Sequence, residues 1–425
     1  MLPNGITQDT SSLQMHIAFI TPEFLKEDKL YPGGLSTYIF TAASGLIGRG
    51  HRVTVFLSGH QDRELDFHGI RVLERKKRIP ERLSFLHDKL SKWIPQSYDR
   101  IISSWSLRKY IREETARDPV DILHYTNWKA IGLFPAEGNS LIRISSYEKL
   151  WDNNPSNNHL DKRLTRKIES MSYAKFRHII GPGDYLARRI VTDLRLSGTV
   201  DILPTPFSPS VGMSDRDFRK PGMKLVVYAG TISRIKGAEL LFKIIREYLG
   251  RHQDTFFLLA GKSGNINGTG CEKELASLAA KFPKHFAHYP HLDRADLMAA
   301  FSQADAVLIP SVVDNFPNTA LEAISNGAIV ITSDTASLGS LIMDGQNGFI
   351  LEDREPEEWI STIRKVLFGL GPEKIEKMKL SMKDSLLPHE TGHAVEELEK
   401  YYNRIITGTY RANMQERKKR MKTRK

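Results

Sequence analysis

Uninterrupted apolar segments, each followed by a polar loop and an amphipathic segment, constrain the fold of this chain more than any other feature. Residues 306–309 are continuously apolar and are closed by Pro310, which predicts a buried parallel strand. Pro317 suits a first helical turn, Gly327 ends that helix, and residues 328–332 form the next apolar strand. This order predicts an open α/β sheet, in which ligands bind at the carboxyl ends of the strands.

The same unit occurs twice more in the chain. In the first copy, a strand at 15–21 is followed by a helix at 35–49 and a strand at 52–57. In the second copy, a strand at 223–229 leads into a helix, and the next strand is at 255–260. Two doubly wound units in one chain predict two domains with a cleft between them.

The length of 425 residues is too large for one hydrophobic core, and a hydrophobic content of 40% is enough for two. A proline-rich crossing is the expected hinge, with Pro204, Pro206, Pro209 and Pro221. The expected parts of the chain are a first Rossmann-like domain at 1–205, a second at 206–385, a helical segment at 386–412 and a basic tail at 413–425.

Cysteine content and hydropathy indicate the compartment. The single cysteine, Cys271, excludes a disulfide framework, which favours a reducing environment. No stretch approaches eighteen consecutive apolar residues, and the N-terminus lacks a basic segment followed by a long apolar run. We therefore expect a cytoplasmic protein, with attachment to the inner face of a membrane left open.

Two carboxylates flank the start of the helix predicted after Pro317. The free backbone N–H groups and the dipole at this helix start favour a phosphate at residues 316–319. Asp314 lies in the preceding loop and Glu322 lies inside the helix, so they would reach different parts of one extended ligand. Sugar hydroxyls need such acceptors. A nucleotide sugar, with a diphosphate between a sugar and a ribose, matches this order of groups.

This stretch resembles the donor-site motif of the retaining GT-B glycosyltransferases, the family that includes sucrose synthase and bacterial glycogen synthase. The family motif is Glu, seven residues, Glu, and here it is Asp314, seven residues, Glu322. The resemblance implies an α/β GT-B fold, in which two Rossmann-like domains face each other across a cleft and a C-terminal helix returns to the first domain. It also implies that Asp314 binds the donor sugar and acts in catalysis, and that Glu322 binds the ribose. The other donor-site residues implied by this stretch are Asn315, Phe316, Pro317, Asn318 and Thr319.

Two further loops match the family's donor site. Gly33 and Gly34 remove side chains before a helix, so that backbone amides can approach a phosphate, and in the family such a pair faces the donor diphosphate. Lys236 lies in a loop that resembles the family's Gly-Arg…Lys-Gly, whose lysine neutralises the departing diphosphate. The family's arginine corresponds to Thr231 here, and Arg234 is the substitute that we expect.

The acceptor side departs from the family. Many members have a histidine near the anomeric carbon, but the matching stretch at 141–149 has none. We expect Ser145 or Ser146 to occupy its place, and His124, which ends a strand predicted at 121–124, is the other polar candidate. In the family the leaving phosphate of the donor is thought to help deprotonate the acceptor, so that the reaction needs no protein base.

A metal and a cofactor are not expected. Residues 389–393 satisfy the HExxH signature of zinc proteases. However, Pro388 indicates that a helix only begins there, and Gly392 weakens it. The rest of the chain supplies no framework of a protease.

Basic clusters account for the net charge of +11 and lie at 75–78, 162–167 and 417–425. Nucleic acid is not expected as a partner, because no RNA-binding motif with interleaved aromatic residues accompanies them. A helical stripe beside Arg82, Lys89 and Lys92 either lies at an anionic membrane surface or packs on its own domain. The stripe consists of Leu83, Leu86, Leu90, Trp93 and Ile94.

The sequence thus predicts a retaining, metal-independent glycosyltransferase that moves a sugar from a UDP- or GDP-sugar to a hydroxyl of a glycan or glycolipid. Family habit suggests the assembly of surface polysaccharide, such as lipopolysaccharide, or of glycolipid. The alternatives are a nucleotide-sugar epimerase or phosphorylase on the same fold, or a non-catalytic protein that binds a nucleotide sugar.

Overall fold

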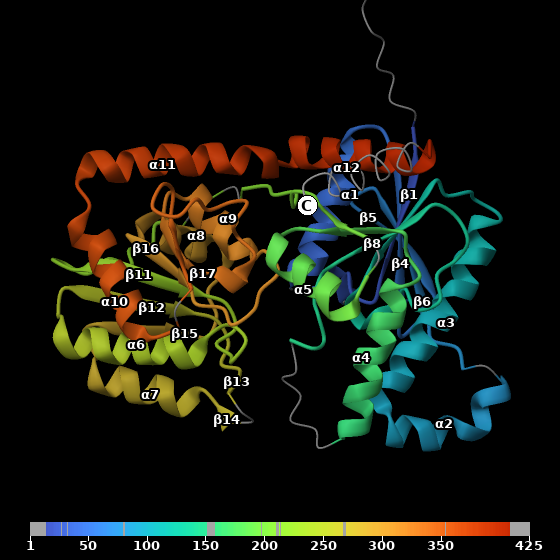
Figure 1. Cartoon of the computed structure of the whole chain (residues 1–425), viewed down its shortest axis with the longest axis horizontal. Helices are drawn as coiled ribbons and strands as arrows, with labels where there is room; N and C mark the ends of the chain where they lie inside the picture. The colour runs from blue at the N-terminus through green and yellow to red at the C-terminus, as the bar shows by residue number, and fades with distance from the viewer. Residues whose placement is uncertain are drawn as a thin grey trace, which may run out of the picture.

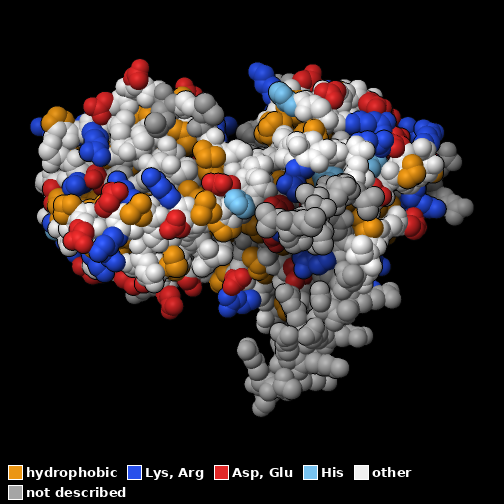
Figure 2. Space-filling model, turned by 90° about the horizontal axis from the view of Figure 1, so that it is seen from above, with side chains coloured by type: hydrophobic (Ala, Val, Ile, Leu, Met, Phe, Trp, Pro, Cys, Tyr) orange, Lys and Arg blue, Asp and Glu red, His pale blue; other side chains and the backbone are white. Residues whose placement is uncertain are grey.

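The computed structural model contains two α/β domains that lie side by side, each built around a mostly parallel sheet (Figure 1). Figure 2 shows them as two lobes separated by an indentation at one edge. None of the described helices combines the length and the apolar character needed to cross a membrane. The basic tail expected at 413–425 lies outside the described residues. Those residues are 14–26, 28–31, 33–79, 81–150, 158–196, 198–209, 212, 214–266, 269–352 and 354–408.

The first sheet has eight strands within the described residues, and among them only the edge strand β5 runs antiparallel to its neighbour. The order across the sheet is β10 (Val200–Ile202), β9 (His178–Gly181), β8 (Ser140–Arg143), β7 (Ile122–Thr126), β1 (His16–Thr21), β4 (Arg52–Gly59), β6 (Ile70–Lys76) and β5 (Arg63–Phe67). The helices of this domain are α1 (Gly34–Gly48), α2 (Glu81–Trp93), α3 (Pro95–Thr115), α4 (His159–Tyr173) and α5 (Asp184–Leu194).

The second sheet, in the described part of the chain, has six strands, all parallel. Its order is β15 (Phe286–Tyr289), β12 (Thr255–Ala260), β11 (Lys224–Ala229), β16 (Ala306–Ile309), β17 (Ile329–Ser333) and β18 (Phe349–Leu351). Numbered within the domain this is 3-2-1-4-5-6, the Rossmann order. The predicted pair of Rossmann-like domains is therefore confirmed. The helices are α6 (Ala238–Arg251), α7 (Glu272–Lys281), α8 (Arg294–Gln303), α9 (Asn318–Ser325), α10 (Pro356–Arg364) and α11 (Pro372–Leu386).

Two short antiparallel pairs complete the strands. They are β2 (Leu25–Lys26) with β3 (Lys29–Leu30), and β13 (Asn265–Ile266) with β14 (Thr269–Gly270).

The unit β16–α9–β17 shows how the sequence sets the local structure. Every residue of β16 is buried, as expected for an apolar strand between two parallel neighbours. Pro317 is the N-cap of α9, one position before the helical turn that the sequence predicts for it. Gly327 adopts a positive φ of 81°, which lets the chain leave the helix and enter β17.

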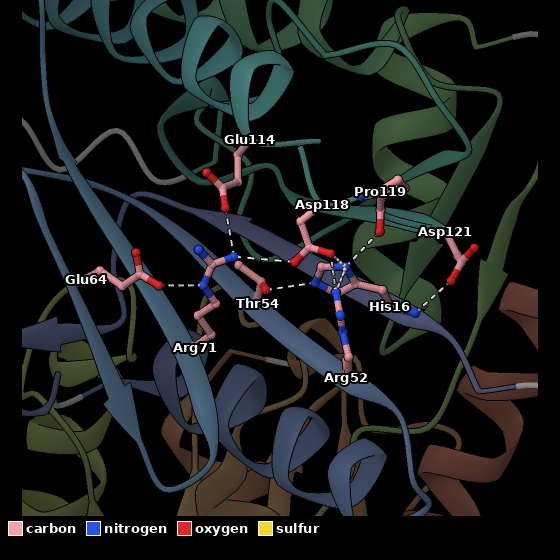
Figure 3. Close-up of polar contacts among 9 residues, drawn as sticks. All are labelled: His16, Arg52, Thr54, Glu64, Arg71, Glu114, Asp118, Pro119 and Asp121. Carbon is pink, nitrogen blue, oxygen red and sulfur yellow. Dashed lines mark hydrogen bonds and ion pairs between the residues drawn. The ribbon is translucent and has the colours of Figure 1, made fainter. Parts of the chain in front are cut away.

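A polar network closes the amino ends of the first-sheet strands (Figure 3). His16 Nδ1 lies 2.8 Å from the Pro119 carbonyl oxygen, and Nε2 lies 2.9 Å from the Thr54 hydroxyl. Arg52 pairs with Asp118 at 2.5 Å. Burial lowers the pKa of His16, which disfavours the charged form of the ring that links β1 with β4.

The chain crosses between the domains twice, and the two crossings run side by side. The first crossing contains Phe207, whose N–H donates to the His389 carbonyl of the second crossing at 2.7 Å. Ser208 and Thr391 share a hydrogen bond of 2.7 Å between their hydroxyls. After the second crossing, helix α12 (Thr391–Ile406) continues from α11 and lies over the first domain (Figure 1).

Helix α12 belongs to the hydrophobic core of the first domain, where the family resemblance puts it. It packs against α1, and its apolar face belongs to the core cluster of the first domain through Val395, Leu398, Tyr401, Tyr402 and Ile405. The closest approach is at Gly45 of α1, because a Cβ there would lie 2.6 Å from Cγ2 of Val395 and 2.9 Å from Cγ2 of Thr391. A glycine at this position therefore allows the two helices to touch.

We predict that Gly45→Val destabilises the protein by about 1–3 kcal/mol, because the new side chain overpacks a contact with the stiff, β-branched Val395. Gly48→Val is the matched control, since Gly48 lies on the same helix with no atom within 4 Å of its Cβ position. Denaturant unfolding of both variants measures the difference. Equal losses of unfolding free energy would contradict the close approach at Gly45.

Candidate active site

A cavity of about 450 Å³ lies between the two domains at the carboxyl ends of their strands. Ligands of open parallel sheets bind at this position. The second-domain wall of the cavity contains Lys236, Glu322 and residues 314–319. The first-domain wall contains Glu23, Gly33, Gly34, Leu35, Thr37, Tyr38, Trp128, Arg143, Ser145, Ser146 and Thr205.

Lys236 and Asp314 form an ion pair in the second-domain wall. Lys236 Nζ lies 2.5 Å from Asp314 Oδ2, which also accepts from the Ser311 hydroxyl at 3.2 Å. Gly237 makes this pairing feasible. It has a positive φ of 79°, and a Cβ there would lie 1.8 Å from the carbonyl oxygen of Pro310. The missing side chain therefore lets the lysine loop lie against the strand that leads to the aspartate.

The two members of the pair differ in exposure. The Lys236 side chain is 29% exposed, whereas that of Asp314 is 8% exposed. Asp314 Oδ1 accepts from the backbone N–H of Asn315 at 2.9 Å, so the carboxylate keeps partners if the lysine moves. Lys236 can thus turn its charge toward a ligand in the cavity without leaving Asp314 unsolvated.

The starts of two helices face each other across the cavity. Neither α1, capped by Gly33, nor α9, capped by Pro317, has a side chain that bonds its first N–H groups. A Cβ at Gly34 would lie 3.8 Å from Nδ2 of the Asn318 side chain, so the two helix starts lie close together. Because helix starts carry free N–H groups and partial positive charge, this gap favours an anion.

Glu322 lines the cavity from inside α9 and is buried. Burial raises the pKa of its carboxyl, and Arg294 opposes that change from 3.0 Å. The paired carboxylate is available to accept hydrogen bonds from ligand hydroxyls. Its separation from Asp314 along the chain agrees with two contacts on one extended molecule.

The loop between Asp314 and α9 contacts the first domain. The Asn315 amide donates to the Ile144 carbonyl at 2.9 Å. Phe316 has a positive φ of 63°, which is rare for an aromatic residue, and its ring stacks on that of His389 at 4.8 Å. The domain-crossing segment therefore supports this strained loop.

Ser145 and Ser146 both line the cavity, opposite the donor-motif loop. Asn127 holds them in place, because its Oδ1 accepts from both backbone N–H groups, at 2.6 and 3.2 Å. The Asn127 amide in turn donates to Glu169 at 3.1 Å. Burial raises the pKa of Glu169 to about 8. The Ser145 hydroxyl is buried and has no hydrogen-bond partner among the described residues.

His124 is not part of the cavity wall, which corrects the sequence expectation. Strand β7 continues to Thr126, so His124 lies within the strand rather than at its end. Its ring is fully buried, and Nδ1 contacts the Tyr402 hydroxyl of α12 at 2.7 Å. Burial holds the pKa of this histidine well below its usual value. His124 is therefore a core residue that packs against α12.

Arg234 is also absent from the cavity wall. Arg234 is exposed to solvent. Thr231, which corresponds to the family's arginine, does not line the cavity either. The structure thus gathers the other predicted donor-site residues and both serines, but not Arg234 or His124.

Sequence reasoning missed several residues of the first-domain wall. Trp128 follows β7 and donates to Glu23, whose pKa burial raises. The next two residues, Lys129 and Ala130, both have positive φ, so Trp128 sits on a strained turn. Arg143 is the last residue of β8 and follows Leu141 and Ile142. An aromatic residue in the loop that follows β7 was the available signal for Trp128, whereas no sequence signal indicated Arg143.

The HExxH stretch does not form a metal site. His389 lies in a 3-10 turn and is buried against Phe316, whereas His393 lies on α12 and is largely exposed. Across the described residues, no group of three or more His, Cys, Asp or Glu side chains is arranged to hold a metal ion.

Two family profiles match the chain. "Glycosyl transferases group 1" matches residues 214–379, and "Glycosyltransferase Family 4" matches residues 32–210. The first profile covers the Lys236 loop and the whole of β16–α9–β17. The second covers the first-domain wall from Gly33 to Thr205. Together they span both walls of the cavity.

Among curated relatives, the D-inositol 3-phosphate glycosyltransferase of Corynebacterium kroppenstedtii is 27% identical over 175 residues, which are 38% of this chain and 38% of that protein. The enzyme of the same name from Corynebacterium jeikeium is 24% identical over 34% of this chain and 35% of its own length. The spore coat protein SA of Bacillus subtilis is 24% identical over 34% of this chain and 40% of its length. The matches thus span little more than a third of these relatives.

Solved structures share the fold over nearly the whole chain. The sucrose-phosphate synthase of Thermosynechococcus elongatus gives a TM-score of 0.71 at 15% identity, covering 93% of this chain and 100% of that one. Anabaena Alr3699/HepE in complex with UDP and glucose gives a TM-score of 0.62 at 14% identity, over 92% and 100%. With both family profiles matched in sequence, this chain belongs to the group 1 glycosyltransferases of the GT-B fold.

Proposed function

We propose that this protein is a glycosyltransferase that moves a sugar from a nucleoside-diphosphate sugar, UDP- or GDP-linked, to a hydroxyl of a glycan or glycolipid. The observation that carries the proposal is the placement of Lys236, Asp314 and the start of α9 on one wall of a cavity between two Rossmann-like domains. This set offers positive charge for a diphosphate and carboxylates for hydroxyls within the same space.

The diphosphate of the donor would lie between the starts of α1 and α9, next to Lys236. As the glycosidic bond breaks, negative charge grows on the departing diphosphate, and these preorganised groups stabilise it. Because a lysine and two helix starts provide this charge, we propose a reaction that does not depend on a metal. Asp314 would contact the donor sugar and Glu322 the ribose.

Retention of configuration is part of the proposal. The acceptor hydroxyl would approach from the first-domain wall, on the same face as the leaving diphosphate, and its proton would pass to a phosphate oxygen. The protein then contributes placement and electrostatic stabilisation. Ser145 and Ser146 are the proposed acceptor-side groups, since they lie in the wall opposite the donor motif.

Two other activities remain testable alternatives on this fold. A nucleotide-sugar epimerase would use no separate acceptor, and a phosphorylase would require free phosphate. A protein without activity would bind the donor and leave it intact. Incubation with UDP- and GDP-sugars separates these outcomes, because slow hydrolysis of the donor marks a transferase. A donor recovered unchanged from every mixture would contradict the proposal.

We predict that Lys236→Ala and Glu322→Ala each lower kcat/KM for the donor at least about tenfold, because each removes a group that the bound donor contacts. Lys243→Ala is the matched control, as Lys243 is an exposed lysine on α6 outside the cavity. Donor turnover measured by release of the nucleoside diphosphate tests all three. Rates near that of the parent protein for the first two variants would remove these residues from the donor site.

We also propose that the first domain binds an anionic membrane surface through α2. The side chains of Leu86, Leu90 and Ile94 are half-buried, which supports packing of that part of the stripe on its own domain. Phe85 and Trp93, however, are 78% and 64% exposed. The Lys89 ammonium lies 4.6 Å from the centre of the Trp93 ring, so apolar and cationic groups are adjacent.

We predict that vesicles containing anionic lipid bind the protein more tightly than vesicles of phosphatidylcholine alone, and that Phe85→Ala with Trp93→Ala weakens this binding several-fold. Leu380→Ala is the control, since Leu380 is an exposed apolar residue of α11 on the second domain. Co-sedimentation measures the bound fraction. Equal binding to both kinds of vesicle, or no effect of the double substitution, would exclude α2 as the membrane contact.

A further inference from the structure

Arg143 is a buried cation in the wall of the cavity. It is the last residue of β8, where the three preceding residues are Ser140, Leu141 and Ile142, and only 7% of its surface is exposed. The exposed part faces the cavity, since Arg143 is one of its lining residues. A charge at this depth requires a partner or a ligand.

The surroundings of Arg143 are neutral. The guanidinium stacks on the Tyr38 ring, 3.6 Å from its centre, and donates to the Ile144 carbonyl and the Thr205 hydroxyl, each at 3.4 Å. Burial raises the pKa of Tyr38 and of Tyr402, so both phenols stay uncharged. No carboxylate pairs with Arg143 among the described residues.

Arg143 differs from the cations near the second-domain wall, because each of those has a carboxylate partner. Lys236 is paired with Asp314, and Arg294 with Glu322. Burial lowers the pKa of Arg143, but a guanidinium keeps its proton in proteins. Arg143 is therefore a permanent positive charge without a carboxylate partner in the described part of the chain, since Glu23, the carboxylate of the same wall, interacts with Lys129 and Trp128. Stacking on Tyr38 fixes the plane of the guanidinium, which suits two parallel hydrogen bonds to a phosphate or carboxylate.

The position of Arg143 favours the acceptor as the source of this anion. The proposed donor diphosphate already has Lys236 and the starts of α1 and α9. Arg143 instead comes from the same segment as Ser145 and Ser146, on the wall from which the acceptor would approach. The loop at Ile144, directly after it, contacts Asn315 of the donor motif, so an anion at Arg143 would lie near the donor.

We propose that Arg143 binds a phosphate or carboxylate group of the acceptor, so that the acceptor of this glycosyltransferase is anionic. The inference rests on the proposed function, because it assigns one wall of the cavity to the acceptor. It names the substrate class of that wall and makes Arg143 the residue that selects it.

The first experiment compares acceptors that differ only in charge: glucose with glucose 6-phosphate, and glucose with glucuronate. We expect kcat/KM to favour the charged member of at least one pair, and Arg143→Met to reduce that preference at least about tenfold. Arg143→Lys should retain part of it, since it keeps the charge and loses the planar fork. An equal loss for charged and neutral acceptors in Arg143→Met, or no preference in the parent protein, would overturn the proposal.

The second experiment does not depend on turnover. With the donor site filled by saturating UDP, inorganic phosphate should raise the Tm of the parent protein and raise that of Arg143→Met by much less. An equal shift in both proteins would place the bound phosphate elsewhere and overturn the proposal. Failure to hydrolyse any nucleotide sugar would contradict the proposed function instead, and the phosphate shift would still report on Arg143.

Discussion

The ion pair between Lys236 and Asp314 is the interaction on which the site depends. A pair this close to the protein interior is expensive to desolvate and contributes little net stability, so its value lies in the position of the charges. That position follows from a backbone contact. Gly237 lies against the carbonyl of Pro310, which joins the loops after two adjacent parallel strands, β11 and β16. The sheet thereby sets the distance between a cation and an anion.

The two walls of the cavity differ in how their charges are balanced. At the second-domain wall Lys236 is paired with Asp314, and Arg294 with Glu322, so a bound diphosphate would draw on Lys236 and on the free N–H groups of the helix starts. In the first domain the charge of Arg143 is left to aromatic and neutral polar neighbours. A ligand that reaches the first-domain wall therefore meets in Arg143 a cation that has no carboxylate partner among the described residues. This asymmetry is the physical basis for distinguishing donor from acceptor in one cavity.

Much of the fold could be predicted because apolar strands and glycine or proline punctuation are local signals. The strand at 255–260 has the predicted bounds, and the helix after Pro317 begins within one residue of its prediction. The prediction for His124 was wrong because it assumed that the strand ends at this residue. Strand β7 continues for two more residues, to Thr126. Arg143 was missed for a related reason, as an isolated charge beside an apolar run gives no sign of which wall it will face. Such facts come from tertiary packing.

The adjacent crossings at Phe207 and His389 limit how the two lobes can move. Two chain segments bonded to each other tie the lobes together along one line, so a rotation about this line would disturb fewer contacts than a sliding motion. Phe316 stacks on His389 of that line, so such a rotation would displace its loop least and the opposite rim of the cavity most. The molecule should consequently admit its substrates from the side opposite the pivot and release them by the same route.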